Sequence, residues 1–220
     1  MNTRWPAVKH VVWDWNGTLL DDTALCIEIM NELLGERDLP QLDKARYQEI
    51  FDFPVVDYYA RLGFDFSRDP FHLIGAEFIR RYEARRTEAR LHAAATSTLT
   101  ALRAAGFSQS VLSAYKHDTL ESLLAHFEVR GFFGDVLGSD DVYAHGKVEQ
   151  GRAWIRTRAI DPRHMLLIGD TRHDFEVAVA MGCHCLLVAD GYHPRSKLEP
   201  LGAPVVDDLS GVCKELGVGR

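Results

Sequence analysis

The chain has 220 residues, of which 46% are hydrophobic and 26% are charged, and its formal net charge at pH 7 is −7. Such a length and composition are typical of a globular protein with one or two domains. The negative charge argues against nucleic-acid binding and against binding to an anionic membrane surface, although a local cationic pocket can still hold a small phosphorylated substrate. No run of about 18 apolar residues occurs, so we expect no membrane-spanning helix.

We expect no signal peptide, because Asp14 interrupts the N-terminal apolar run and no small-residue cleavage site follows. The cysteines are too few and too scattered for a disulfide framework, so a reducing cytoplasm fits best, with a monomer or homodimer as the default state. Cys183-His184-Cys185 suggests a metal site, but alternation along a strand accounts for it better by placing both thiols on one buried face.

The first predicted strand covers residues 8–14 and is rich in β-branched and aromatic side chains. It ends in Asp14-Trp15-Asn16-Gly17-Thr18. A carboxylate at the carboxyl end of a buried strand, followed by glycine, is where an open α/β sheet places its chemistry. Asp14 is therefore a candidate nucleophile and metal ligand, and Gly17 permits a tight turn whose amides can approach an anion. A strand that simply ends in an Asx turn is the alternative.

Residues 19–90 change character and form a predicted all-helical insert without strands. Its helices are expected at about residues 25–35, 44–51, 54–62 and 71–82. The last helix has one apolar stripe, and its other face carries four arginines among glutamates: Arg80, Arg81, Arg85 and Arg86. We interpret this face as a solvent-exposed mixture of charges rather than as a phosphate site.

From residue 96 the pattern alternates between strands and helices. Strands are expected at about 108–113, 132–137, 165–168 and 185–188, and helices at about 96–105, 118–127, 146–158 and 175–181. Residues 190–205, with several Gly and Pro, are expected to form a loop. This alternation predicts an α/β fold with a parallel sheet and helices on both of its faces.

Four polar features follow a strand or begin a helix: residues 14–18, Ser113, Lys147 and residues 170–174. In a parallel sheet the carboxyl ends of all strands lie at one edge, so we expect these features to converge. Asp14, Asp170 and Asp174 would repel one another unless a cation lay between them. All-oxygen ligation with few carboxylates suits Mg²⁺, which also screens an anionic nucleophile from an anionic phosphate.

The remaining features supply positive charge and hydrogen-bond donors. Lys147 can neutralise the nucleophile and the phosphate together. The hydroxyl of Ser113 and the backbone amides of Trp15, Asn16 and Ala114 can donate to phosphate oxygens. Attack of Asp14 on phosphorus would form an aspartyl-phosphate, which water would then hydrolyse.

These features resemble the four motifs of the haloacid dehalogenase-like (HAD) superfamily of hydrolases, along nearly the whole chain. The resemblance implies a Rossmann-like catalytic core formed by residues 1–18 and 91–220, with residues 19–90 inserted as a small helical cap. In phosphoglycolate phosphatase-like members, the position of Asp52-Phe53-Pro54 is a substrate-facing turn of the cap. The implied activity is that of a Mg²⁺-dependent phosphatase acting on a small phosphorylated metabolite.

The resemblance also implies roles for individual residues. Catalysis would involve Asp14, Asn16 and Lys147. The metal ligands would be Asp14, Asp170 and the backbone carbonyl of Asn16, while Asp174 would be a ligand or would orient a metal-bound water. The expected phosphate-binding residues are Gly17, Thr18, Ser113, Ala114 and Lys147.

Asn16 departs from the pattern, because phosphatases of the family usually have there a second Asp that protonates the leaving oxygen and later activates water. Dehalogenating members also lack this Asp, but they lack an acidic fourth motif as well, so Asp170 and Asp174 argue against dehalogenation. Phosphonate-cleaving members need a lysine in the cap, and residues 19–90 contain only Lys44.

Three interpretations of Asn16 remain. The substrate has a good leaving group that needs little protonation. Another group supplies the proton, for which the candidates by position are His173, His117, His145 and Lys116. Alternatively, the protein has low activity or binds phosphate without catalysis.

Overall fold

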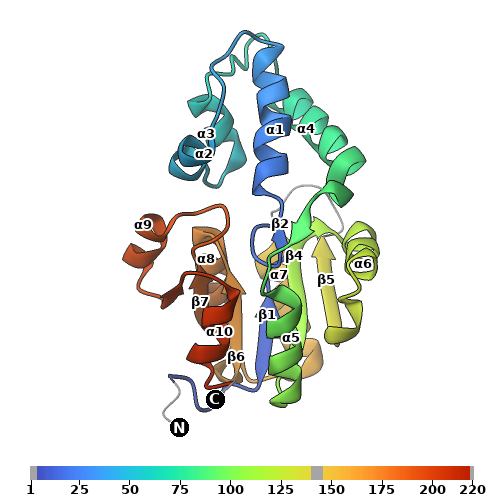
Figure 1. Ribbon diagram of the computed structural model, residues 1–220, viewed down its shortest axis with the longest axis vertical. Helices are drawn as coiled ribbons and strands as arrows, with labels where there is room; N and C mark the ends of the chain where they lie inside the picture. The colour runs from blue at the N-terminus through green and yellow to red at the C-terminus, as the bar shows by residue number, and fades with distance from the viewer. Residues whose placement is uncertain (1–3, 140–145, 219–220) are drawn as a thin grey trace.

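The computed structural model describes residues 4–139 and 146–218. Its larger part is built on a six-stranded sheet in the order β5-β4-β1-β6-β7-β8, and every neighbouring pair is parallel (Figure 1). The strands are β1 (His10–Trp13), β4 (Ser108–Lys116), β5 (Asp135–Ser139), β6 (Met165–Gly169), β7 (His184–Val188) and β8 (Val205–Val206). The predicted α/β class with a parallel sheet is confirmed.

Successive side chains of the strands pack on opposite faces of this sheet, as the two-residue period of a strand requires. Val11 and Ile168 belong to the larger apolar core, whereas Val12 and Leu167 belong to a second, smaller one. The larger core also contains buried side chains from α5 (Ala95–Ala104), α6 (His117–His126) and α10 (Leu209–Glu215). The second is covered by α7 (Lys147–Arg158) and α8 (Arg172–Met181).

A series of buried hydrogen bonds connects the neighbouring strands β1 and β4 to α5. The indole Nε1 of Trp13 donates to Oε1 of Gln109 at 3.0 Å, and Nε2 of Gln109 donates to the carbonyl oxygen of Leu99 at 3.0 Å. Because all of these atoms lie in the core, each depends on the others for a hydrogen-bond partner.

The helical insert extends from one end of the sheet (Figure 1). Its four helices are α1 (Thr23–Gly35), α2 (Lys44–Ile50), α3 (Val55–Arg61) and α4 (Phe71–Arg85). The expectation that residues 19–90 contain no strand was wrong. The chain enters the insert through β2 (Leu20–Asp21) and leaves it through β3 (Arg90–Leu91), and these pair antiparallel. Two-residue strands are too short to produce a periodic pattern.

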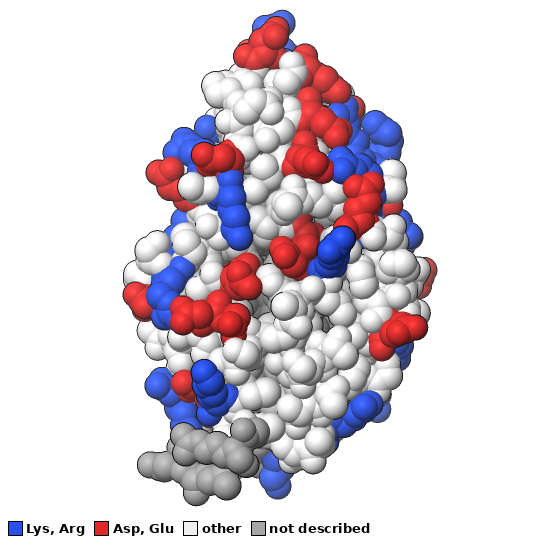
Figure 2. Space-filling view, viewed as in Figure 1, with Lys and Arg blue, Asp and Glu red and all other residues white. Residues whose placement is uncertain are grey.

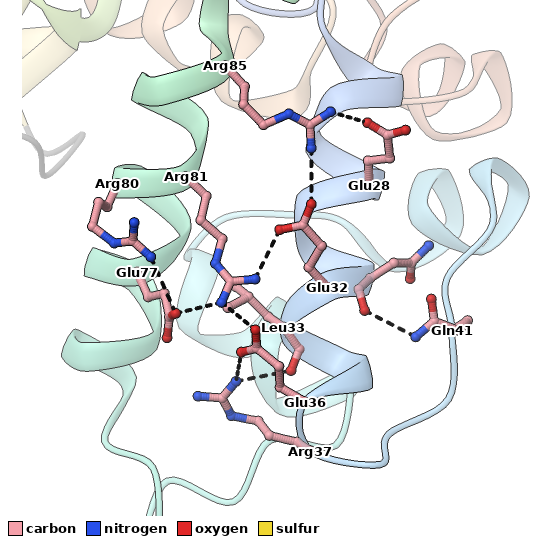
Figure 3. A network of polar contacts seen from close by, with 11 residues as sticks. Glu28, Glu32, Leu33, Glu36, Arg37, Gln41, Glu77, Arg80, Arg81 and Arg85 are labelled. Carbon is pink, nitrogen blue, oxygen red and sulfur yellow. Dashed lines mark hydrogen bonds and ion pairs between the residues drawn. The ribbon is translucent and has the colours of Figure 1, made fainter.

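The arginines of α4 lie against glutamates of α1 and of their own helix (Figure 3). Arg81 contacts Glu32, Glu36 and Glu77 at 2.6–3.0 Å. Arg85 bridges in the same way to Glu28, Glu32 and Glu88. The face is the expected mixture of charges, but the Arg81 and Arg85 side chains are only 14% and 28% exposed, so it is a network of ion pairs rather than a freely solvated surface.

The segment 190–205 contains more regular secondary structure than the predicted loop. The predicted loop 190–205 contains a short helix, α9 (Arg195–Leu198), then a 3₁₀ turn, η5 (Glu199–Leu201), and it ends within β8. Pro194 directly precedes α9, Pro200 lies within η5, and Gly202 directly follows it, so these residues belong to short elements rather than to an irregular loop.

On the face shown in Figure 2, acidic and basic side chains alternate over the described surface without forming a continuous basic patch. Among the described residues, none of the helices combines the length and the apolar character that crossing a bilayer requires.

Replacing Gln109 by Met should lower the free energy of unfolding by about 2 kcal/mol, because Trp13 Nε1 and the Leu99 carbonyl would lose their partners inside the core. Urea unfolding followed by tryptophan fluorescence measures this change. Gln41→Met is the matched control, since Gln41 is exposed and its hydrogen bond to Asn31 faces solvent; we expect a change below about 0.5 kcal/mol. Equal decreases in the free energy of unfolding of the two variants would show that the buried hydrogen bonds of Gln109 do not stabilise the fold.

Candidate functional site

The site forms where β1 ends between its two neighbours. Trp13 pairs with Val111 of β4 on one side and with Ile168 of β6 on the other. Just beyond it, the N–H of Asp14 donates to the carbonyl oxygen of Ile168 at 2.9 Å. The polar residues that follow β1 and β6 therefore emerge side by side at one edge of the sheet, as a parallel arrangement requires.

Three buried carboxylates meet at this edge. One oxygen from each of Asp14, Asp170 and Asp174 lies within 4.8 Å of the others, and this is the one such group of His, Cys, Asp or Glu side chains in the described parts of the chain. The residues are only 8%, 0% and 2% exposed. The Nζ of Lys147 lies 2.7 Å from Asp14 Oδ1 and 2.6 Å from Asp174 Oδ1. With all groups ionised, one buried lysine leaves two negative charges uncompensated.

The turn after Asp14 is pressed against Asp170. The hydroxyl of Thr18 donates to Asp170 Oδ1 at 2.6 Å and lies 3.4 Å from Asp14 Oδ2. Gly17 has a φ of +77°, and a Cβ atom built there would overlap the carboxylate of Asp170. Only glycine therefore allows both this turn and the close approach.

Asp174 has two functions in the first turn of α8. Its carboxylate accepts hydrogen bonds from the N–H and the hydroxyl of Thr171 at 3.0 and 2.7 Å, which completes a capping box at the start of the helix. Its other oxygen contacts Lys147. The helix cap thus fixes the position of a carboxylate that also faces the site.

The pKa values of these groups are shifted in different directions. Burial raises the pKa of Asp14 to about 7 although Lys147 opposes the shift, and burial together with the neighbouring Asp174 and Asp14 carboxylates raises the pKa of Asp170. Burial also disfavours the charge of Asp174, but Lys147 outweighs it and lowers the pKa of Asp174. Burial alone would lower the pKa of Lys147, yet the two carboxylates raise it, so the lysine is a cation.

Asn16 points to a carboxylate that we did not select from the sequence. Its Nδ2 donates to Asp22 Oδ2 and to Tyr82 Oη, both at 2.8 Å. The fully buried Asp22 also accepts hydrogen bonds from the N–H of Gly17 at 3.1 Å and from the hydroxyls of Tyr82 and Tyr192 at 2.6–2.9 Å. Burial raises the pKa of Asp22. The available signal in the sequence was an acidic residue directly before the first helix of the insert.

The other expected phosphate-binding residues lie on β4. Ser113 is buried, and its hydroxyl accepts a hydrogen bond from the N–H of Tyr115 at 3.1 Å. Ala114 is half-buried beside it. Hydrogen bonds therefore link Asp14, Thr18, Lys147, Asp170 and Asp174 into one group, while Ser113 and Ala114 lie outside that group on the neighbouring strand.

The candidate proton donors have different positions. His145 lies outside the described residues. Lys116 is exposed at the end of β4, and His117 begins α6. His173, on α8, is half-buried and its ring lies 5.0 Å from the ring of Phe53 in the insert. Burial lowers the pKa of His173.

The turn at residues 51–54 connects the insert to the edge of the sheet. The carbonyl oxygen of Phe51 accepts hydrogen bonds from Lys197 Nζ at 2.7 Å and from His193 Nε2 at 3.1 Å. The carboxylate of Asp52 lies 3.8 Å from Arg172 Nε. Burial lowers the pKa of His193 to about 4, so this hydrogen bond comes from a neutral imidazole. These contacts bring the turn to the first residues of α8.

Without divalent cations, stability should fall as the pH rises through about 7. The folded protein holds the proton of Asp14 more tightly than the unfolded chain, whose carboxyl titrates near about 4. The resulting stabilisation is complete below pH 4 and is lost as the pH rises through the folded pKa. In EDTA, the free energy of unfolding should fall between pH 5.5 and 8 by roughly 2 kcal/mol more for the native protein than for Asp14→Asn, as measured by urea unfolding. The same pH dependence of the free energy of unfolding in both proteins would show that the pKa of Asp14 is not raised in the folded state.

The model of the family "Haloacid dehalogenase-like hydrolase" matches residues 11–188. A phosphoglycolate phosphatase from Salmonella typhi is 30% identical over 124 residues, which are 55% of this chain and 49% of that protein, so the match spans about half of the relative. One from Rhodospirillum rubrum is 25% identical over 221 residues, 95% of this chain and 91% of the relative.

Solved structures show the same fold. A haloacid dehalogenase-like family hydrolase from Streptococcus pneumoniae superposes with a TM-score of 0.81 at 19% identity, covering 96% of this chain and 99% of the other. A predicted phosphatase from Clostridium acetobutylicum gives a TM-score of 0.80 at 19% identity, covering 95% and 98%. The Rossmann-like α/β architecture is thereby confirmed.

Proposed function

The chain belongs to the haloacid dehalogenase-like hydrolase family, and we propose that it is a Mg²⁺-dependent phosphatase that cleaves phosphate monoesters through a phosphorylated Asp14. The observation that carries this proposal is the buried group of Asp14, Asp170 and Asp174 around Lys147. The carboxylate proposed as nucleophile, the lysine ammonium group and the oxygen ligands for a metal ion are in direct contact or within 4.8 Å of one another. Phosphoryl transfer requires these three kinds of group together.

The donor set fits a magnesium ion. Its side-chain donors are carboxylate oxygens, and the two uncompensated charges favour a divalent cation. Asp14, Asp170, the backbone carbonyl of Asn16 and Asp174 would hold the ion, the last directly or through water. When bound, Mg²⁺ would supply charge neutralisation for the carboxylates and the phosphate.

The side chains of the chain itself would perform the transfer. Asp14 is oriented by Lys147 on one oxygen and lies near the Thr18 hydroxyl on the other. A carboxylate oxygen of Asp14 attacks phosphorus, the bond from phosphorus to the leaving oxygen breaks, and that oxygen departs with the electron pair. Lys147 and donors near Ser113 and Ala114 would offset the negative charge. Water then attacks the phosphorus, the bond from phosphorus to the Asp14 oxygen breaks, and phosphate leaves with the protons of the water while the carboxylate of Asp14 is restored.

Asn16 restricts the leaving group. An amide cannot deliver a proton, and its nitrogen is already directed at Asp22 and Tyr82. A phenol, with a pKa of about 10, departs as an anion far more readily than an alkyl alcohol, whose pKa is close to the value of about 16 for water. We therefore propose that the substrate has a good leaving group, which is a phenolate in an aryl phosphate, a carboxylate in an acyl phosphate or a phosphate in a phosphoanhydride.

The names of the relatives support a small phosphorylated substrate, and we propose that residues 19–90 act as a cap over a core formed by residues 1–18 and 91–220. The phosphonate-cleaving alternative gains no support, because Lys44 is exposed and lines a separate pocket with Asp21 and Glu28. A non-catalytic phosphate-binding protein is the second candidate, and Asn16 is the observation that favours it.

We expect the purified protein to release phosphate from phenyl phosphate in the presence of Mg²⁺ and to lose that activity in EDTA. Asp14→Asn should reduce kcat by at least about 1,000-fold, because the nucleophile is removed while the size of the side chain is kept. Malachite-green detection of phosphate measures both. A retained rate in Asp14→Asn would exclude the covalent mechanism, and binding of phosphate without any turnover would favour the non-catalytic candidate.

Asn16→Asp should raise turnover of ethyl phosphate by roughly 100-fold, the usual range for a general acid. The new carboxyl would face Asp22 across the 2.8 Å hydrogen bond that Asn16 makes now, so the two carboxylates would share a proton and one of them would stay protonated near neutral pH. Steady-state kinetics with ethyl and phenyl phosphate tests this, with the larger gain expected for the ethyl ester. A decrease for both esters would show that Asn16 is required as an amide.

A further inference from the structure

A cavity of about 850 Å³ lies among the helices of the insert, and His173, Glu176 and Tyr192 of the core also line it. All four helices of the insert contribute residues to its wall. Most of the lining side chains are aromatic or aliphatic, with Met30, Tyr47, Tyr59 and Phe78 as representatives, one from each helix. Its volume and lining match those of sites that bind small organic molecules.

The cavity adjoins the carboxylate site through two residues of the core. His173 lines the cavity and directly precedes Asp174. Tyr192 also lines it, while its backbone N–H donates to Asp170 Oδ2 at 2.7 Å. A molecule whose phosphate lies at Asp14 can therefore place its organic group in this cavity.

Charge in the lining disfavours a second anionic group on the ligand. Among the described lining residues, the one Lys or Arg is Arg80, whose side chain is 70% exposed and lies 3.7 Å from Glu77. Glu176 of the core adds a negative charge to the same wall. A carboxylate buried here would have no buried cation beside it, at a cost that an uncharged group avoids.

The lining also has the features that orient a flat ring. Phe51 and Tyr58 meet edge to face at 5.2 Å, and Tyr58 and Tyr59 do so at 5.7 Å, so these buried rings hold one another in place. Other lining rings, those of Phe53, Phe71 and Phe78, are only partly buried and can contact a further aromatic partner.

We propose that this cavity receives the aromatic group of an aryl phosphate, so that the protein is selective for phosphate esters of phenols; this rests on the phosphatase function proposed above. Two independent features agree on this class. The cavity favours an uncharged ring, and Asn16, which cannot donate a proton to an alkoxide, favours a phenolate leaving group.

Binding of non-hydrolysable phosphonates tests the cavity separately from turnover. In isothermal titration calorimetry with Mg²⁺ and the Asp14→Asn variant as host, benzylphosphonate should bind roughly 10- to 100-fold more tightly than ethylphosphonate, because a ring is buried. Phosphonoacetate, which carries a carboxylate, should bind more weakly than benzylphosphonate.

Gly75→Leu in the same host should lower this benzyl-to-ethyl ratio by roughly tenfold, since Gly75 lines the cavity and a Cβ there meets only Phe71 Cζ at 4.0 Å. Ala84→Leu is the matched control, because it adds a similar side chain to an exposed position of α4 outside the cavity lining, and the ratio should not change. Thermal unfolding of both variants shows whether each is folded, and the smaller Gly75→Ala should give an intermediate ratio.

Equal affinities for benzyl- and ethylphosphonate, tighter binding of phosphonoacetate, or an unchanged ratio in a folded Gly75→Leu variant would overturn the inference. Phenyl phosphate turnover by the native protein is measured in parallel. Tighter binding of benzylphosphonate without any turnover would support an aromatic binding site in the cavity and contradict the phosphatase function. Turnover without tighter binding of benzylphosphonate would support the phosphatase function and contradict the aromatic binding site.

Discussion

Three carboxylates and one lysine are buried together at one edge of the sheet. The strands and helices around them supply the hydrogen bonds and ion pairs that hold these charges in place. Asp14, Asp170 and Asp174 repel one another, so each needs fixed donors on its outer side. Asp174 obtains them from the capping box of α8, and Asp170 from Thr18 and the N–H of Tyr192. Lys147, at the start of α7, compensates part of the charge from the centre. We propose that a divalent cation completes this balance.

The fold and the main members of the site could be predicted because their signals are local. Buried parallel strands are continuous apolar runs, and the polar residues after them must emerge at one edge of the sheet. This reasoning places Asp14, Asp170 and Asp174 together without any knowledge of distances. Lys147 required the additional assumption that the start of α7 faces the same edge, which the structure supports with its two short ion pairs.

The features that were missed depend on contacts between distant segments. Asp22 had the appearance of an ordinary acidic residue before a helix, and only the folded chain shows that Tyr82 and Tyr192, from two other segments, donate to it. The strands β2 and β3 are two residues each and arise because the two connections to the insert run side by side. The apolar cavity is equally invisible in a sequence, since the same aromatic residues could have packed into a closed core.

Asp22 also has a mechanical consequence. Its carboxylate joins Asn16 and Gly17 of the loop after β1, Tyr82 near the end of the insert, and Tyr192 of the core. A rotation of the insert about β2 and β3 that drew Tyr82 away from this junction would take one hydrogen-bond partner from Asp22 and one from Asn16, because Tyr82 is bonded to both. The orientation of the insert and the conformation of the loop beside Asp14 are therefore coupled. Strain applied to the outer helices would be transmitted to the backbone amide of Gly17 without passing through the sheet.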